Sequence, residues 1–155
     1  MASIDNSAPD RLTPQQRWAR SEANCCFVCG PSNPIGLHLV FHLDDEVCRA
    51  EFTPGEFHVG YGGVLHGGIL YSALDDVMAN VLYLRGLQAV TARCEIRYRG
   101  EPVKVGTKIL LEGRLRRRKG PLAIIEGRAL RSADGEVVAE SEASFMVTGD
   151  LPDLE

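Results

Sequence analysis

The spacing of apolar positions changes twice along the chain, from two to about 3.6 and back to two. Apolar and polar residues alternate from Ile35 to Leu43 and again over 47–53, as in half-buried strands. From His66 to about Leu84 the apolar residues have the spacing of a helix face: Ile69, Leu70, Ala73, Leu74, Val77, Met78, Val81 and Leu82. Alternation then returns in four segments, 90–99, 105–116, 122–130 and 137–147. The pattern predicts about six strands and one long helix.

Short turns between the strands predict how they pair. Asp44-Asp45 closes a first hairpin, and Lys119-Gly120-Pro121 and Ala133-Asp134-Gly135 join later strands. Consecutive strands joined in this way form an antiparallel sheet. The helix has almost no charge except Asp75 and Asp76, so most of its surface needs cover. A curved sheet wrapped round this helix provides that cover, and we therefore predict an α+β hot-dog fold.

Residues outside this domain form an extension at the amino terminus and a short tail. Thr13, Pro14 and Gln16 suit the N-cap, first and capping-box positions of a helix. They predict a short helix that ends at about Ala23. We expect an extension over 1–24, a hot-dog domain over 25–148 and a tail over 149–155.

Composition and charge narrow the classes of function. The 155 residues suit one domain, and 45% of them are hydrophobic. The formal net charge of −4 gives no electrostatic reason to bind nucleic acid or an anionic membrane. No apolar run reaches the roughly 20 residues of a membrane-spanning helix, and the first 24 residues hold no secretory signal. Five cysteines, an odd number, argue against a disulfide framework, so we expect a cytoplasmic protein.

Candidate chemistry is densest at the start of the long helix. Residues 58–68 form a glycine-rich loop that ends in His66-Gly67-Gly68. Glycine lets a ligand approach the backbone, and a helix start offers unpaired N–H groups. Such a loop can act as an oxyanion hole, although a tight turn alone would also use these glycines.

Two carboxylates lie in the middle of the apolar helix, at Asp75 and Asp76. Burying a carboxylate is costly unless it is paired or functional. One of the two can point to solvent or to a subunit interface, but the wrapped helix has little free surface for both.

These motifs together resemble one family of enzymes. His66-Gly67-Gly68, an aspartate nine residues after His66, and a strand that opens Thr91-Ala92 and ends Ile96-Arg97-Tyr98 are similar to the PaaI-like acyl-CoA thioesterases of the 4-hydroxybenzoyl-CoA thioesterase superfamily. Upstream, the segments 26–30 and 33–37 resemble one bacterial branch of that group. The resemblance runs from about Cys26 to Val147 and implies hydrolysis of acyl-CoA thioesters.

The resemblance also implies a role for each matching residue. Gly68, and with it Gly67, would polarise the thioester carbonyl through backbone N–H groups, and His66 would orient the loop or the substrate. Asp75 would be the nucleophile or the general base that activates water, and Thr91 would position that water or the carboxylate. The site would lie at the dimer interface of a homodimer or homotetramer, without a metal or an organic cofactor.

Two features bear on how well the site matches the family. Many relatives carry Asn six residues before the motif histidine, where this chain has Gly60. In a regular strand Thr91 falls on the opposite face from Val90 and Ala92, so its reach to the site would depend on subunit pairing.

Two further clusters each have alternative interpretations. Cys26-x-x-Cys29 and His38-x-x-x-His42 contain zinc-ligand residue types, but a lone CxxC opening a loop favours a structural turn, and we expect no metal. Arg116, Arg117 and Arg118 either bind the phosphates of coenzyme A or form a solvated hairpin tip.

The predicted function is therefore an acyl-CoA thioesterase. A non-catalytic acyl-CoA-binding protein is the alternative from another class, but a mere binder gains nothing from a buried carboxylate at Asp75. A hot-dog hydratase or dehydratase would need a histidine paired with an acid to move protons at carbon, and His66 does not supply that pair.

Overall fold

The computed structural model describes residues 22–151 of the chain. Its elements, in chain order, are the 3-10 helix η1 (Glu22–Cys25), β1 (His42–Asp44), β2 (Val47–Phe52), the 3-10 helix η2 (Glu56–His58), α2 (Gly67–Tyr83), β3 (Leu87–Tyr98), β4 (Ile109–Lys119), β5 (Leu122–Arg131) and β6 (Val137–Asp150).

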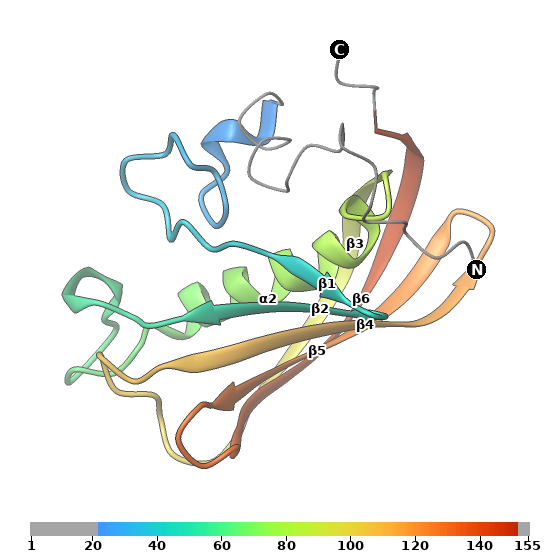
Figure 1. The fold of residues 1–155 in the computed structure, drawn as a ribbon. Coiled ribbons are helices and arrows are strands. Elements are labelled where there is room, and N and C mark those ends of the chain that lie inside the picture. Colours follow the sequence, from blue (N-terminus) through green and yellow to red (C-terminus); the bar gives the residue numbers. More distant parts are fainter. Residues whose placement is uncertain (1–21, 152–155) are drawn as a thin grey trace.

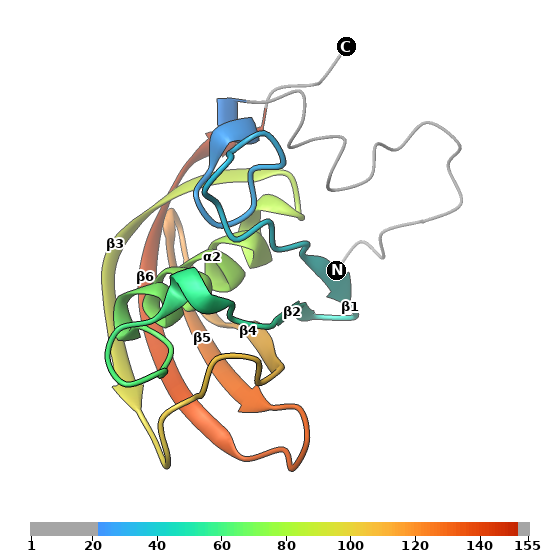
Figure 2. The same ribbon diagram turned by 90° about the vertical axis from the view of Figure 1, so that its left-hand side faces the viewer.

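The six strands form one antiparallel sheet in the order β1-β2-β4-β5-β6-β3. Figures 1 and 2 show this sheet curving around α2, which lies along its concave face. β1 and β3 are the edge strands, and β3 pairs on one side with β6. The predicted hot-dog fold is confirmed.

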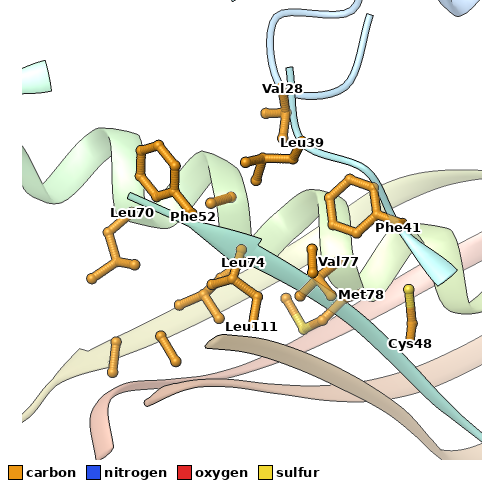
Figure 3. Close-up of a cluster of buried hydrophobic side chains, with 14 of the residues drawn as sticks. Val28, Leu39, Phe41, Cys48, Phe52, Leu70, Leu74, Val77, Met78 and Leu111 are labelled. Carbon is orange, nitrogen blue, oxygen red and sulfur yellow. The ribbon is translucent and has the colours of Figure 1, made fainter. Parts of the chain in front are cut away.

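One apolar core joins the helix to the concave face of the sheet. Leu74, Val77 and Met78 are fully buried in it (Figure 3). Two strand glycines let α2 approach closely, because a Cβ on Gly113 would lie 2.7 Å from the Val77 carbonyl oxygen and one on Gly127 would lie 3.0 Å from Met78 Cγ. A larger residue at either position would push the helix off the sheet.

The amino-terminal loop, from Cys26 to Leu39, covers the side of α2 that the sheet leaves open (Figures 2 and 3). The Leu37 N–H donates to the Phe27 carbonyl at 2.8 Å, and the Leu39 N–H donates to the Val28 carbonyl at 2.9 Å. The strand expected from Ile35 is therefore wrong over most of its length, because these residues pair with the loop instead of a strand. The alternation in the sequence survives as alternating burial along an extended segment.

Two other boundaries differ from the expected ones. β4 begins at Ile109 rather than near Val105, because the Val105 N–H donates to the Gly63 carbonyl at 3.0 Å and Gly106 turns the chain with a φ of 87°. β6 continues to Asp150, past the expected end of that strand at Val147.

The short helix expected from Thr13 to about Ala23 lies outside the described residues except for its last two positions. Those two open η1. Within residues 22–151, no helix is long and apolar enough to cross a membrane.

Candidate active site

The glycine-rich loop is a narrow hairpin that delivers the chain to the start of α2. The Gly60 N–H donates to the Val64 carbonyl at 2.9 Å, and the His66 N–H donates to the His58 carbonyl at 2.8 Å. Gly62 and Gly63 turn the tip with φ values of 59° and 75°, which favour glycine. The sequence predicted this loop, and its hydrogen bonds fix where the helix begins.

His66 is the N-cap of α2, and its side chain occupies one of the helix-start amides. Its Nδ1 accepts a hydrogen bond from the Gly68 N–H at 2.9 Å. A Cβ on Gly68 would lie 2.9 Å from His66 Cε1, so this cap requires glycine there. Within the described chain the Gly67 N–H makes no hydrogen bond. The resemblance gave the carbonyl-binding role first to Gly68, whereas the geometry leaves Gly67 as the available donor.

Tyr98, at the end of the edge strand β3, also holds the helix start. Its hydroxyl donates to the Gly67 carbonyl at 2.6 Å, and a Cβ on Gly67 would lie only 3.2 Å from that hydroxyl. We did not assign Tyr98 a role from the sequence, although it ends the strand motif that carries the family resemblance. It fixes the position of the Gly67 peptide.

Gly60 packs directly against His66. A Cβ at Gly60 would lie 3.2 Å from His66 Cα and 3.4 Å from its Cδ2. Asparagine at this position would therefore require the loop to move away from the histidine. Glycine at position 60, in place of the asparagine of many relatives, therefore fits the tight packing of this loop against His66.

Asp75 and Thr91 form the polar centre of the site. The Thr91 hydroxyl donates to Asp75 Oδ1 at 2.9 Å. Burial raises the pKa of Asp75, and the hydrogen bond from Thr91 offsets part of that rise. The carboxylate is thereby oriented through one oxygen, while it keeps a second oxygen for a ligand or water.

A bulge in β3 explains how Thr91 reaches Asp75 within one chain. Thr91 pairs with Phe145 and Arg93 pairs with Ser144, so Ala92 is an extra residue. The bulge reverses the parity after Thr91 and puts Thr91 on the same face as Cys94. The expected dependence on subunit pairing is wrong for this contact.

Asp76 points away from Thr91, toward the amino-terminal loop. Its Oδ1 lies 4.0 Å from Cys26 Sγ, and its Oδ2 lies 3.5 Å from Asn80 Nδ2. Burial raises the pKa of Asp76 to about 7. The two neighbouring carboxylates therefore have separate surroundings, as their offset of about 100° on a helix requires.

The helix start and Asp75 are too far apart to act on one carbonyl within a single chain. Eight residues separate Gly67 from Asp75. At 1.5 Å per residue, they are about 12 Å apart along the helix axis. A carbonyl polarised at Gly67 needs its attacking group within about 3.5 Å.

The three arginines of the β4–β5 hairpin do not share one environment. Arg116 lies in a bulge of β4 and makes ion pairs with Glu126 at 3.3 Å and Glu142 at 2.6 Å. Arg117 and Arg118 have no carboxylate partner among residues 22–151, although Arg118 Nε donates to a backbone carbonyl at 3.1 Å. Of the three arginines, only Arg117 and Arg118 have guanidinium groups without a carboxylate partner in the part of the chain that the structure describes.

The two histidines considered as zinc ligands lie away from the cysteines. The His38 ring bonds to the Asn33 carbonyl, and both His38 and His42 are exposed. Instead, the fold brings Asp76 to Cys26 and Cys29. That contact joins residues 47 or more positions apart, so the sequence spacing gave no sign of it.

A broad depression lies over the face of the sheet that points away from α2, and none of the expected site residues lines it. A row of alternating charges crosses five paired strands on this face, formed by Arg49, Glu112, Arg128, Glu140 and Arg97. The Arg128–Glu112 pair is 2.7 Å long. These charges compensate one another, so we assign this face to stability and not to the reaction.

A curved sheet around one helix, a glycine-rich helix start and a carboxylate held by a hydroxyl are the features that the sequence motifs predicted for a member of the hot-dog class. The family described as the thioesterase superfamily matches residues 62–139, and the chain belongs to this superfamily. The family identified from the sequence motifs is confirmed. A search of curated proteins finds no match.

Solved structures of low identity share the fold. A hypothetical thioesterase from Streptococcus pneumoniae, solved with coenzyme A, has a TM-score of 0.68 and 19% identity over 74% of this chain and 91% of that chain. The E. coli PaaI protein of the phenylacetic acid degradation operon has a TM-score of 0.68 and 19% identity over 74% of this chain and 83% of that one. Another thioesterase superfamily protein has a TM-score of 0.74 and 25% identity over 90% of this chain and 68% of its own.

Proposed function

We propose that this protein is an acyl-CoA thioesterase in which Asp75 drives attack on the thioester carbonyl. The observation that carries the proposal is the Asp75–Thr91 hydrogen bond of 2.9 Å, because it orients a half-buried carboxylate beside a sheet edge. Superfamily membership supports thioester hydrolysis. Similar structures contain coenzyme A in the protein from S. pneumoniae and acetyl-CoA in one from Streptococcus mutans.

The pneumococcal protein gives a second line of support. Two of its structures carry alanine in place of an aspartate and in place of a threonine sixteen residues further along that chain. Asp75 and Thr91 have the same separation here. Those substitutions single out the same pair of residue types at the same spacing.

The reaction needs a polarised carbonyl and an attacking oxygen. The Gly67 N–H, at the positive end of α2, donates to the thioester oxygen and stabilises the charge that develops there. Asp75 either takes a proton from water, whose hydroxide adds to the carbonyl carbon, or attacks that carbon itself. In the second route the acyl group is transferred to Asp75 as an anhydride, and a water then hydrolyses this anhydride to release the acid and the free carboxylate. The carbon–sulfur bond then breaks and the coenzyme A thiolate leaves. Thr91 holds the carboxylate in position, and no step requires a metal or an organic cofactor.

Two copies of the chain complete the site in this proposal. The roughly 12 Å between Gly67 and Asp75 along α2 requires the two groups to come from different subunits. β3 offers a free strand edge for pairing in the described chain, and an unpaired edge favours association. Large apolar side chains are exposed on β3, at Val90 and Tyr98, and on the segment that leads to α2, at Phe57 and Tyr61. We therefore propose a homodimer or a tetramer of such dimers.

Coenzyme A would reach the hairpin between β4 and β5. Arg117 and Arg118 are available there for its phosphates beside Lys119, and Arg116 contributes to the same positive field despite its ion pairs. All five cysteines are unpaired thiols in the structure, which fits our expectation of a cytoplasmic location.

Release of coenzyme A from a panel of acyl-CoAs, followed with a thiol dye, tests the proposal. We expect turnover of at least one aliphatic or aromatic acyl-CoA and its loss in Asp75→Asn. Tight binding of acyl-CoA without thiol release would instead identify the non-catalytic alternative. Water addition to an enoyl-CoA without thiol release would identify a hydratase.

A further inference from the structure

We propose that Cys26, Cys29 and Asp76 form a binding site for one Zn²⁺ ion that fastens the amino-terminal loop to α2. The two sulfurs and a carboxylate oxygen lie within 4.8 Å of one another. The cysteines come from the loop and the aspartate from the middle of the helix, 47 residues or more away in the sequence. This site is separate from the Asp75–Thr91 pair and plays no part in the proposed reaction.

The loop folds into a single turn that points both sulfurs in one direction. The Gly30 N–H donates to the Cys26 carbonyl at 2.9 Å and closes that turn. A Cβ on Gly30 would lie 2.3 Å from the Cys26 nitrogen, so the turn requires glycine after the second cysteine.

Asp76 is a buried carboxyl group without a cationic partner in the described chain. Among residues 22–151 no lysine, arginine or histidine forms an ion pair with it, and its polar neighbours are thiols and the Asn80 amide. Asn80 is 1% exposed, and its Oδ1 has no hydrogen-bond partner in the described chain. A buried carboxylate without a cation is costly, and a buried acceptor without a donor is rare. A cation at this position would compensate the carboxylate. Asn80 faces Asp76 Oδ2 with its Nδ2 at 3.5 Å, so its side chain would turn to bring the unpartnered Oδ1 to the ion.

The chemistry of the donors favours zinc over harder cations. Zn²⁺ binds thiolate sulfur at about 2.3 Å and carboxylate oxygen at about 2.0–2.2 Å in tetrahedral sites. Such ligand atoms lie roughly 3.5–3.8 Å apart, so the cluster has to contract by only about 1 Å. Binding releases the thiol protons to solvent. Asn80 Oδ1 or a water would take the fourth position.

The consequence of metal binding is a fastened loop. This loop, from Cys26 to Leu39, covers the open side of α2 with Val28 and Leu39 (Figure 3). It has few strand hydrogen bonds to hold it there. Zinc would raise the melting temperature through binding to the folded state, without changing the hydrogen bond between Thr91 and Asp75.

Metal uptake by the reduced, untagged full chain tests the proposal. After removal of metal with a chelator, we expect the protein to take up one Zn²⁺ per chain and to melt several degrees higher. With Co²⁺ we expect the near-ultraviolet charge-transfer band of thiolate ligands. Cys26→Ser, Cys29→Ser and Asp76→Asn each remove a ligand, so each should weaken uptake by more than the roughly 10- to 100-fold that loss of a supporting residue costs.

Cys25→Ser is the matched control, because Cys25 adjoins Cys26 in sequence but is exposed and outside the cluster. It should bind metal as the wild type does. The cobalt spectrum of the wild type keeps the test decisive even where Cys29→Ser does not fold. Absence of uptake by the wild type, or equal losses in Cys25→Ser and Cys26→Ser, would overturn the proposal. The reduced chain could also take up no zinc and instead form a Cys26–Cys29 disulfide readily. That result would overturn the zinc site and assign the cysteine pair to redox chemistry.

Discussion

At the residue scale, carbonyl activation in the proposed mechanism depends on the Gly67 amide. His66 has ψ 128°, a backbone conformation that tolerates a following proline, and Gly67 is the first helical position, where proline fits well. Gly67→Pro therefore removes the N–H while keeping the helix start. We expect kcat to fall about 10²- to 10³-fold relative to Gly67→Ala, as for loss of one oxyanion donor.

Gly67→Ala is the control for this comparison. Both variants place a Cβ about as close to the Tyr98 hydroxyl, 3.2 Å away in the wild-type geometry, and only proline lacks the donor. Steady-state kinetics on one acyl-CoA measures the difference. Equal kcat values in the two variants would show that the Gly67 amide does not bind the carbonyl oxygen.

Single residues also show what the sequence could and could not predict. Asp75 and the glycine loop were predictable because a carboxylate in an apolar helix and a glycine run at a helix start are local anomalies. Which of the two amides, Gly67 or Gly68, is free to donate a hydrogen bond was not predictable, because it depends on the rotamer of His66. The approach of Asp76 to Cys26 and Cys29 depends on how the loop folds over the helix.

At the scale of elements, the central strands carry a charge row whose contribution depends on pH. Burial by itself would raise the pKa of Glu112, but hydrogen bonds from Arg128 and Arg49 together lower it below its ordinary 4.5. Because the pKa of Glu112 is lower in the folded chain than in the unfolded chain, its carboxylate stabilises the fold fully at pH values above the ordinary pKa. This stabilisation is lost as the pH falls through the folded-state pKa.

Glu112→Gln should therefore reduce the free energy of unfolding by about 1–2 kcal/mol near neutral pH, since both arginines are partly exposed and screened. The difference between variant and wild type should shrink below about pH 4. Urea unfolding at several pH values measures it. A difference that stays constant down to pH 3 would assign the loss to packing and not to charge.

The hairpin between β4 and β5 carries the second prediction at this scale. Replacing Arg117 and Arg118 together by alanine should raise KM for acyl-CoA about tenfold and leave kcat nearly unchanged, because phosphate binding is far from the reacting carbon. A short thioester without the nucleotide should react as before. Lys108→Ala, at the opposite end of β4, is the control cation. Equal losses on both substrates would indicate a structural role for the hairpin.

Elements differ in how well their patterns could be interpreted. The long helix, β5 and most of β6 were predicted, because their periods are regular and their turns are marked by glycine. The segment before β1 alternates as a strand does, yet it pairs with the loop at Phe27 and Val28. The bulge at Ala92 left no local sign, because one extra residue in a strand of alternating polarity looks regular.

At the scale of the whole molecule, the two-subunit site makes a sharp prediction about mixed dimers. Gly67→Pro and Asp75→Asn chains are each inactive, but a hybrid dimer holds one site with Gly67 from one chain and Asp75 from the other. An equimolar mixture refolded together should recover about a quarter of the wild-type rate, since about half the dimers are hybrids with one intact site.

Thiol release by the mixture, compared with each variant alone, measures this recovery. If each chain contained a whole site, every hybrid site would keep one defect and no activity would return. Light scattering should report a dimer or a larger even assembly. The sequence alone could not establish this assembly, because the exposed edge of β3 appears only once the strand order is known.

The most direct test of the account is the kcat of Asp75→Asn. This change keeps the shape of the side chain and can keep the Thr91 hydrogen bond, but it removes basicity and nucleophilicity. We predict a fall in kcat of about 10²- to 10⁴-fold with KM little changed, because the carboxylate acts mainly in the transition state. Asp44→Asn, an exposed aspartate at the far edge of the sheet, should match the wild type. An Asp75→Asn enzyme that keeps its kcat within about tenfold of the wild type would contradict the carboxylate mechanism.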